Sequence, residues 1–119
     1  MSGSDAAPPL EERALVFQGG CVRLTLDLRV YRLTAVQKAS YRFAEHFTAI
    51  LGAPEEHRLG VCCLFRPETR EAEALDAVRR YFQELLDQEL REQIGEETRA
   101  VRALILAQAF SRTDLIQRD

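Results

Sequence analysis

Residues 21–30 read CVRLTLDLRV, and this stretch decides the fold. Polar and charged side chains alternate there with a regular set of apolar ones: Val22, Leu24, Leu26, Leu28 and Val30. A period of two indicates a strand with one buried and one solvated face. The short apolar run 14–17 comes before it, and Gly19-Gly20 between the two runs permits a tight reversal. The sequence therefore predicts a hairpin that opens with a short strand.

A helix and a second long strand are predicted next. Thr34 and Gln37 have the spacing of a capping box, and apolar residues then recur at helical spacing until Gly52-Ala53-Pro54. We expect a helix over residues 35–51. His57–Arg66 is apolar on both faces, as an interior strand is, and should lie beside the first long strand. Parallel pairing through a crossover and antiparallel pairing are both compatible with this order.

The last part of the chain predicts two helices. An apolar stripe runs from about Thr69 to Ile94, and Gly95 marks a break or kink. Residues 98–111 are apolar around most of the helix circumference, so this helix is either buried in its own fold or committed to a partner surface. The expected fold class is α+β: a small two- or three-stranded sheet, built from a strand-helix-strand core with a possible N-terminal hairpin strand, packed against two C-terminal helices.

Length and composition indicate one domain. At 119 residues the chain can bury one modest core. We expect a disordered tail over residues 1–12, a single domain over 13–115 and a short tail over 116–119. The start resembles no secretory signal and no run is long enough for a membrane span, so a cytoplasmic protein is expected.

The charges are unevenly distributed along the chain. The net charge is −3, and Lys38 is the one lysine among the cations. Residues 13–42 are basic, with Asp27 as their one carboxylate, whereas 54–98 are rich in carboxylates. The two halves are therefore expected to attract each other. An acidic protein is a poor candidate for nucleic-acid binding, which needs a basic footprint.

The side chains that could support catalysis or bind a metal are few. Cys21, Cys62 and Cys63 form no zinc spacing, and adjacent cysteines on a strand point to opposite faces. His46 and His57 fit surface or boundary positions better than a catalytic role. Glycine-rich phosphate loops and the cysteine loop of a radical enzyme are absent. We expect no catalytic site, no metal site and no cofactor.

The densest polar feature is the charged run from Glu84 to Arg102. One interpretation is a solvated helix face with ion pairs at spacings of three and four. The other is a recognition surface, because directional groups would converge where two helices meet at Gly95. The candidate partner-binding residues, with Gln108 as a lesser candidate in an apolar helix, are Arg91, Glu92, Glu97, Thr98, Arg102 and Gln108.

The same region resembles a known family. Residues 85–92 (LLDQELRE), then Glu97-Thr98 and residues 102–111 (RALILAQAFS), are similar to the signature of the His-Xaa-Ser system protein HxsD. The family motif is Leu-Leu-Asn-Asp-Tyr-x-Leu-Arg-Glu. The matching positions are Leu85, Asp87, Leu90, Arg91 and Glu92, and the departures are Glu84, Leu86 and Gln88. The likeness spans about residues 20–115.

The resemblance implies a setting for the protein. HxsD-like proteins are associated with a His-Xaa-Ser repeat peptide and two radical S-adenosylmethionine enzymes, a layout typical of peptide maturation. The leading hypothesis is an accessory protein or adaptor that binds a modifying enzyme, its precursor peptide or both. An extended peptide could instead add to the edge of the 22–30 strand. A second hypothesis is a homodimer or larger homo-oligomer formed through the last helix, and a third is a thiol enzyme using Cys62 or Cys63 with His57.

Overall fold

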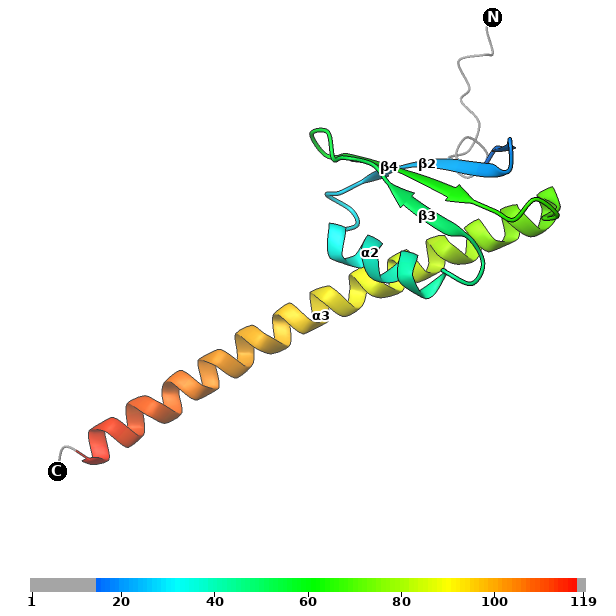
Figure 1. Cartoon of the computed structure of the whole chain (residues 1–119). Coiled ribbons are helices and arrows are strands. Elements are labelled where there is room, and N and C mark those ends of the chain that lie inside the picture. Colours follow the sequence, from blue (N-terminus) through cyan, green and yellow to red (C-terminus); the bar gives the residue numbers. More distant parts are fainter. Residues whose placement is uncertain (1–14, 118–119) are drawn as a thin grey trace, which may run out of the picture.

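Strand β2 (Cys21–Asp27) lies inside a four-stranded sheet. The computed structural model describes residues 15–117, with side chains for 15–111, so the predicted 1–12 tail lies outside the described residues. The sheet order is β1-β2-β4-β3 and each neighbouring pair is antiparallel (Figure 1). The other elements are β1 (Phe17–Gln18), α2 (Leu33–Arg42), β3 (Thr48–Leu51), β4 (Arg58–Leu64) and α3 (Glu71–Gln117).

The predicted hairpin and both long strands are confirmed. Gly19 and Gly20 have φ values of 62° and 78°, which a two-residue hairpin turn with matching twist requires. Strand β4 pairs with β2 along its whole length, and the pairing is antiparallel. Strand β2 ends earlier than predicted, because Asp27 accepts backbone N–H groups from Arg29, Val30 and Tyr31 and so turns the chain.

The α+β fold class is confirmed, although the sheet has four strands and not two or three. The predicted helix over 35–51 is wrong in its second half. Helix α2 ends at Arg42, the chain turns through 43–47, and residues 48–51 form the edge strand β3. Phe43 and Phe47 have helical spacing and both pack on Tyr81, with ring centroids 5.7 and 5.3 Å away. Residues 48–51 differ from a helix because they pair with β4 and alternate, with Ala49 and Leu51 packed against the core.

The core lies between one face of the sheet and the two helices. Alternate side chains of β2 and β4 enter it, and α3 contributes buried residues from Ala74 to Leu85. Tyr81 is fully buried and its hydroxyl lies 2.8 Å from Ser40 Oγ, so the ring is apolar packing with one satisfied polar atom. Both helices cover the same face of the sheet (Figure 1).

The predicted break at Gly95 is wrong: α3 is one continuous helix of 47 residues. A glycine inside a helix costs only about 1 kcal/mol relative to alanine, and strong helix formers surround this one. At 1.5 Å per residue the helix is about 70 Å long. Its first half packs on the sheet and α2, while its second half extends away from them (Figure 1). We call residues 97–111 the projecting segment.

Candidate functional site

The projecting segment makes no packing contact that buries it: every residue from 97 to 111 is exposed. Five of its side chains are large and apolar, with exposures of 50 to 69%: Val101, Leu104, Ile105, Leu106 and Phe110. An apolar helix that extends into water is unstable in isolation, because most helix stability in proteins comes from packing of the apolar face. The predicted alternative of burial within the chain's own fold is therefore not what the structure shows.

Part of this apolar surface continues back along the outer face of α3. Leu86, Leu90 and Ile94 are 47, 47 and 60% exposed. Residues 90, 94, 101 and 104, with Glu97 between them, follow the alternating spacing of three and four that places side chains on one helix face. The exposed stripe is thus continuous from the part of α3 beside the sheet to the projecting segment.

A shallow depression of about 480 Å³ lies on the projecting segment. Its lining combines charged or hydroxyl groups at one end with branched aliphatic ones: Glu97, Thr98, Val101, Arg102, Ile105 and Leu106. Apolar area with a polar margin is typical of protein interfaces. Three of the predicted contact residues, Glu97, Thr98 and Arg102, are therefore brought together on one surface.

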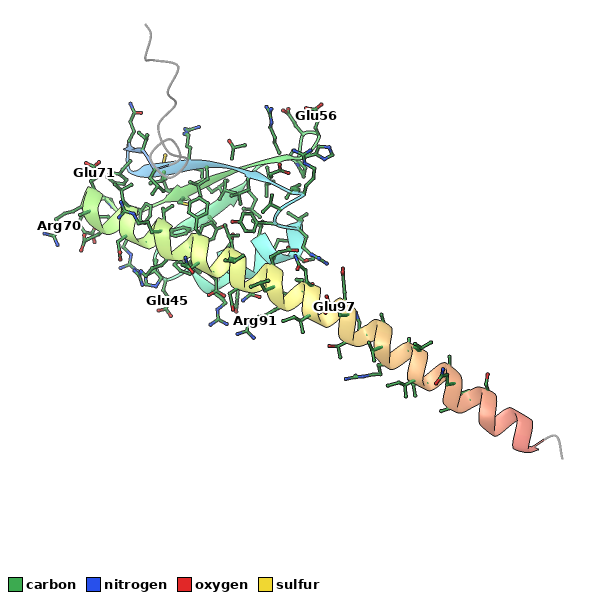
Figure 2. All side chains as sticks on the ribbon, turned by 180° about the vertical axis from the view of Figure 1, so that it is seen from behind. Glu45, Glu56, Arg70, Glu71, Arg91 and Glu97 are labelled. Atoms are coloured by element: carbon green, nitrogen blue, oxygen red, sulfur yellow. The ribbon has the colours of Figure 1, made fainter. Side chains whose placement is uncertain are left out.

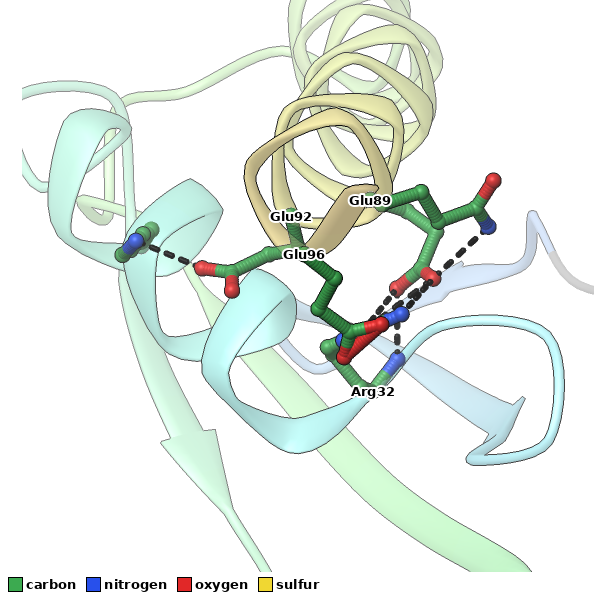
Figure 3. A network of polar contacts seen from close by, with 6 residues as sticks. Arg32, Glu89, Glu92 and Glu96 are labelled. Atoms are coloured by element: carbon green, nitrogen blue, oxygen red, sulfur yellow. Dashed lines mark hydrogen bonds and ion pairs between the residues drawn. The ribbon is translucent and has the colours of Figure 1, made fainter. Parts of the chain in front are cut away.

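The other charged groups belong to a structural network between α2 and α3. Glu89 is buried, and its carboxylate accepts the backbone N–H of Arg32 at 2.9 Å and the guanidinium of Arg32 at 3.2 Å (Figure 3). Glu96 pairs with the same guanidinium, and Gln93 donates to Glu89 at 2.9 Å. Because Arg32 is the N-cap of α2 and makes no side-chain cap, Glu89 occupies the position of a capping group from another helix.

These contacts determine the protonation of Glu89. Burial raises the pKa of this carboxyl, but the hydrogen bonds from the Arg32 backbone, Gln93 and the Arg32 guanidinium outweigh burial and lower it. The side-chain hydrogen bond to Glu96, followed by those to Glu89, raises the pKa of Arg32. Both groups are charged at neutral pH, so the pair stabilises the junction of α2 and α3.

Two further ion pairs continue the network along the antiparallel helices. Lys38 pairs with Glu92, which lowers the pKa of Glu92, and Arg42 pairs with Glu84 at 3.0 Å. The predicted attraction between the basic first half and the acidic second half is thereby confirmed. Among the predicted contact residues, Glu92 serves this internal network.

The remaining predicted contact residues lie apart from one another. Arg91 is beside the sheet-bearing part of the molecule and pairs with Asp87 at 2.7 Å, whereas Glu97 stands where the free part of α3 begins (Figure 2). Gln108 is exposed farther along the projecting segment. No helix corner gathers all six residues, because α3 does not bend at Gly95.

Two of the three cysteines have thiol pKa values that are raised. Cys21, Cys62 and Cys63 are free thiols. Burial raises the pKa of Cys63 to about 12 and also raises that of Cys62. A nucleophilic thiol needs the opposite shift. Within residues 15–111, no three His, Cys, Asp or Glu side chains are grouped so that they could hold a metal ion.

Sequence reasoning missed the pairing of Arg32 with Glu89. These residues are 57 positions apart, and no local spacing links them. The one signal available was the opposite charge of the two regions.

The described helices include none with the length and apolarity needed to cross a bilayer.

The chain is thus a small α+β protein with a long, solvent-exposed helical arm. A family model, His-Xaa-Ser system protein HxsD, matches residues 26–116, which is most of the chain. The chain therefore belongs to the HxsD family, as the motif at residues 85–92 indicated. No curated protein and no solved structure matches it.

Proposed function

We propose that the protein is a non-catalytic adaptor of a His-Xaa-Ser system, in which it binds a radical S-adenosylmethionine enzyme, the precursor peptide or both. Family membership supports the setting. The observation that carries the binding role is the projecting segment, whose large apolar side chains are all at least half exposed. Its contact residues in this proposal are Glu97, Thr98 and Arg102 at the depression, with Gln108 beyond them.

The exposed area is large for a monomer. Aliphatic side chains of this size, exposed by about 60%, present on the order of 100 Å² each, so the projecting segment offers about 500 to 600 Å² of apolar surface. These side chains are distributed around the helix, so a partner must enclose the segment from more than one side to cover all of them. Covering the segment with a partner would bury about 1,000 Å² in total, which is the lower bound for a specific interface.

The polar groups at the margin of the depression determine how a partner is oriented. Glu97, Thr98 and Arg102 line the depression together with Val101, so a partner that covers Val101 also meets a cation and a carboxylate. Such groups add specificity and orientation more than affinity.

A second candidate is self-association through the same segment. Leu90, Ile94, Val101 and Leu104 have coiled-coil spacing, with polar Glu97 within the series. Two copies could pair there as a closed homodimer. Native mass measured over a range of concentrations distinguishes this candidate, because a protein that stays monomeric at all concentrations contradicts it.

Co-purification tests the adaptor proposal. The full chain is co-expressed with the radical enzymes and the precursor peptide of its system, and capture is compared between wild type and Val101→Glu/Ile105→Glu. Since both side chains are exposed, the variant should fold normally and lose the partner. Val30→Glu is a matched control, because Val30 is similarly exposed but lies in the turn after β2.

Charge reversal separates the two places where arginine was predicted to act. Arg102→Glu should weaken capture, whereas Arg91→Glu should have a smaller effect, because Arg91 is paired with Asp87 beside the sheet. Equal capture by wild type and the Val101→Glu/Ile105→Glu variant would refute binding through the projecting segment.

A further inference from the structure

Strand β3 is an open edge of the sheet. Among residues 15–117, β4 is its one neighbouring strand. The hydrogen bond from Gly52 N–H to Gly60 O fixes the register, because residues 52 and 60 are then a hydrogen-bonded pair. Ile50 with Cys62 and Thr48 with Leu64 are hydrogen-bonded pairs by the same alternation. The backbone N–H and C=O groups of Ala49 and Leu51 therefore point away from β4.

A cavity lies directly beside this edge. It has a volume of about 340 Å³ between α2 and β3. Its lining is mixed in character: Gln37, Ser40, Tyr41, Ala44, Phe47, Thr48, Ala49 and Leu51. The side chains of Ala49 and Leu51 point to the helix-covered face of the sheet, so the cavity occupies the place where side chains of a further strand on that face would lie.

One wall of the cavity is formed by an aromatic side chain that is exposed to solvent. Tyr41 of α2 is 84% exposed. The phenol and the amide of Gln37 provide a donor and an acceptor at the rim, while Phe47 and Leu51 provide apolar wall. The cavity suits a side chain of medium size that carries both apolar surface and a hydrogen-bonding group.

We propose that the β3 edge captures an extended segment of the precursor polypeptide by strand addition, with alternate side chains of that segment entering the α2–β3 cavity. This inference rests on the proposed function and names the site of its peptide. The occupant must be extended, because outward backbone groups at every second residue match a strand and not a helix. The unpaired N–H and C=O groups of Ala49 and Leu51 form an edge with which a further strand can pair.

The spacing within a His-Xaa-Ser sequence fits the cavity. In a strand, residues i and i+2 lie on the same face. A histidine and the serine two positions later would therefore both face α2, opposite Ala49 and Leu51. Imidazole combines a flat apolar ring with a donor and an acceptor, which matches the rim of Gln37 and Tyr41 beside Phe47.

The opposite edge of the sheet is a poorer site for the same segment. Strand β1 covers Cys21 and Val22, and the Asp27 carbonyl is already used by Val30 and Tyr31. Arg23 and Thr25 are the outward residues of β2 that β1 does not reach. The cavity near them, lined by Val16, Gln18, Cys21 and Arg23, is smaller, at about 240 Å³. We therefore assign the extended peptide to the edge of β3 and not to the edge of the 22–30 strand.

A binding titration tests the proposal with a defined probe. A fluorescein-labelled synthetic peptide with two His-Xaa-Ser units is titrated with the full chain, and its anisotropy is measured. Ala49→Pro removes one outward N–H without touching the ladder to β4, and the lost hydrogen bond and the bulk of the ring should weaken binding about tenfold or more. Thr25→Pro is the matched control, because it makes the same change at the opposite edge.

Two further measurements locate the peptide. Ala44→Phe fills the cavity from an exposed position, and should also weaken binding while the fold is kept. Amide hydrogen exchange of wild type should slow at Ala49 and Leu51 when the unlabelled peptide is added, and should not change at Arg23 and Thr25.

Each other outcome overturns the proposal. Equal affinity of Ala49→Pro and wild type excludes the β3 edge, and loss of affinity in Thr25→Pro alone assigns the peptide to β2. Protection of Ala49 and Leu51 that rises with protein concentration in the absence of peptide identifies a second copy as the occupant. If the peptide does not bind at the β3 edge but the projecting segment still captures an enzyme, this inference is refuted and the adaptor proposal stands.

Discussion

The carboxylate of Glu89 is expected to be the most important charged group for stability, and Glu89→Gln tests this. The substitution keeps the shape of the side chain but removes its charge. One oxygen becomes an amide nitrogen, which is a donor, and in this site the neighbours are themselves donors: the backbone N–H and guanidinium of Arg32 and the amide of Gln93. The substitution thus removes hydrogen bonds that the wild-type carboxylate accepts, and the new NH2 group faces another donor.

The magnitude follows from the contacts. Hydrogen bonds to charged groups are worth about 1.5 to 3 kcal/mol each, but the Arg32 side chain is 32% exposed and partly screened by water. We therefore expect Glu89→Gln to lower the free energy of unfolding by about 2 kcal/mol. For a chain of this length, that corresponds to a fall in Tm of about 10 °C.

The assay is thermal and urea unfolding followed by circular dichroism at neutral pH. Glu97→Gln is the matched control, because Glu97 is exposed on the projecting segment, where substitutions change stability by less than about 0.5 kcal/mol. If the two variants lose the same stability, Glu89 does not cap α2 and the argument from its buried contacts is refuted.

The pH dependence gives an independent check of the same contact. The pKa of Glu89 in the folded protein is below its ordinary value of 4.5. A carboxyl with a depressed pKa stabilises the fold fully above its unfolded pKa, and the contribution is lost as pH falls through the folded pKa. The stability difference between wild type and Glu89→Gln should therefore be largest above about pH 5 and shrink in more acidic buffer. A difference that grows on acidification would contradict the assigned shift.

Three other predictions concern the helix, the core and the thiols. Gly95→Ala should raise the free energy of unfolding by up to about 1 kcal/mol in urea titrations, because the new methyl group meets only the tip of an arginine side chain at 3.4 Å; a loss of stability would show that α3 is not continuous there. Tyr81→Phe should cost about 1 kcal/mol in the same titrations, because it deletes the hydroxyl 2.8 Å from Ser40 Oγ, and an unchanged stability would mean that this bond contributes nothing. Cys63 should react with a thiol reagent at pH 8 about a hundredfold or more slowly than a free cysteine, since burial raises its pKa to about 12, and it should become reactive on unfolding. Cys62 is partly exposed and should react first. Rapid labelling of Cys63 in the folded protein would contradict this prediction.

Local patterns in the sequence were sufficient for several elements. The alternation at Val22, Leu24 and Leu26 specified a strand and its buried face, because a period of two has no other regular solution. Gly19-Gly20 specified the hairpin turn. The resemblance of residues 85–92, 97–98 and 102–111 indicated the family, which the family model over residues 26–116 confirms.

The long-range arrangement was decided by tertiary contacts. Phe43 and Phe47 fit a longer helix equally well, and it is the pairing of residues 48–51 with β4 that makes this segment the strand β3. That strand creates the open sheet edge and its cavity, so neither could be predicted from the sequence. Nor could the pairing of Arg32 with Glu89, because a contact between residues 57 positions apart leaves no periodic trace.

By itself, therefore, the sequence determined the elements whose signal is local, namely the hairpin, the two long strands and an apolar C-terminal helix. Only the tertiary structure decided that this helix is unbroken and leaves the body of the protein. The reason is physical: a single glycine costs a helix about 1 kcal/mol, which is too little to break it, and whether an apolar face is buried depends on where the rest of the chain lies.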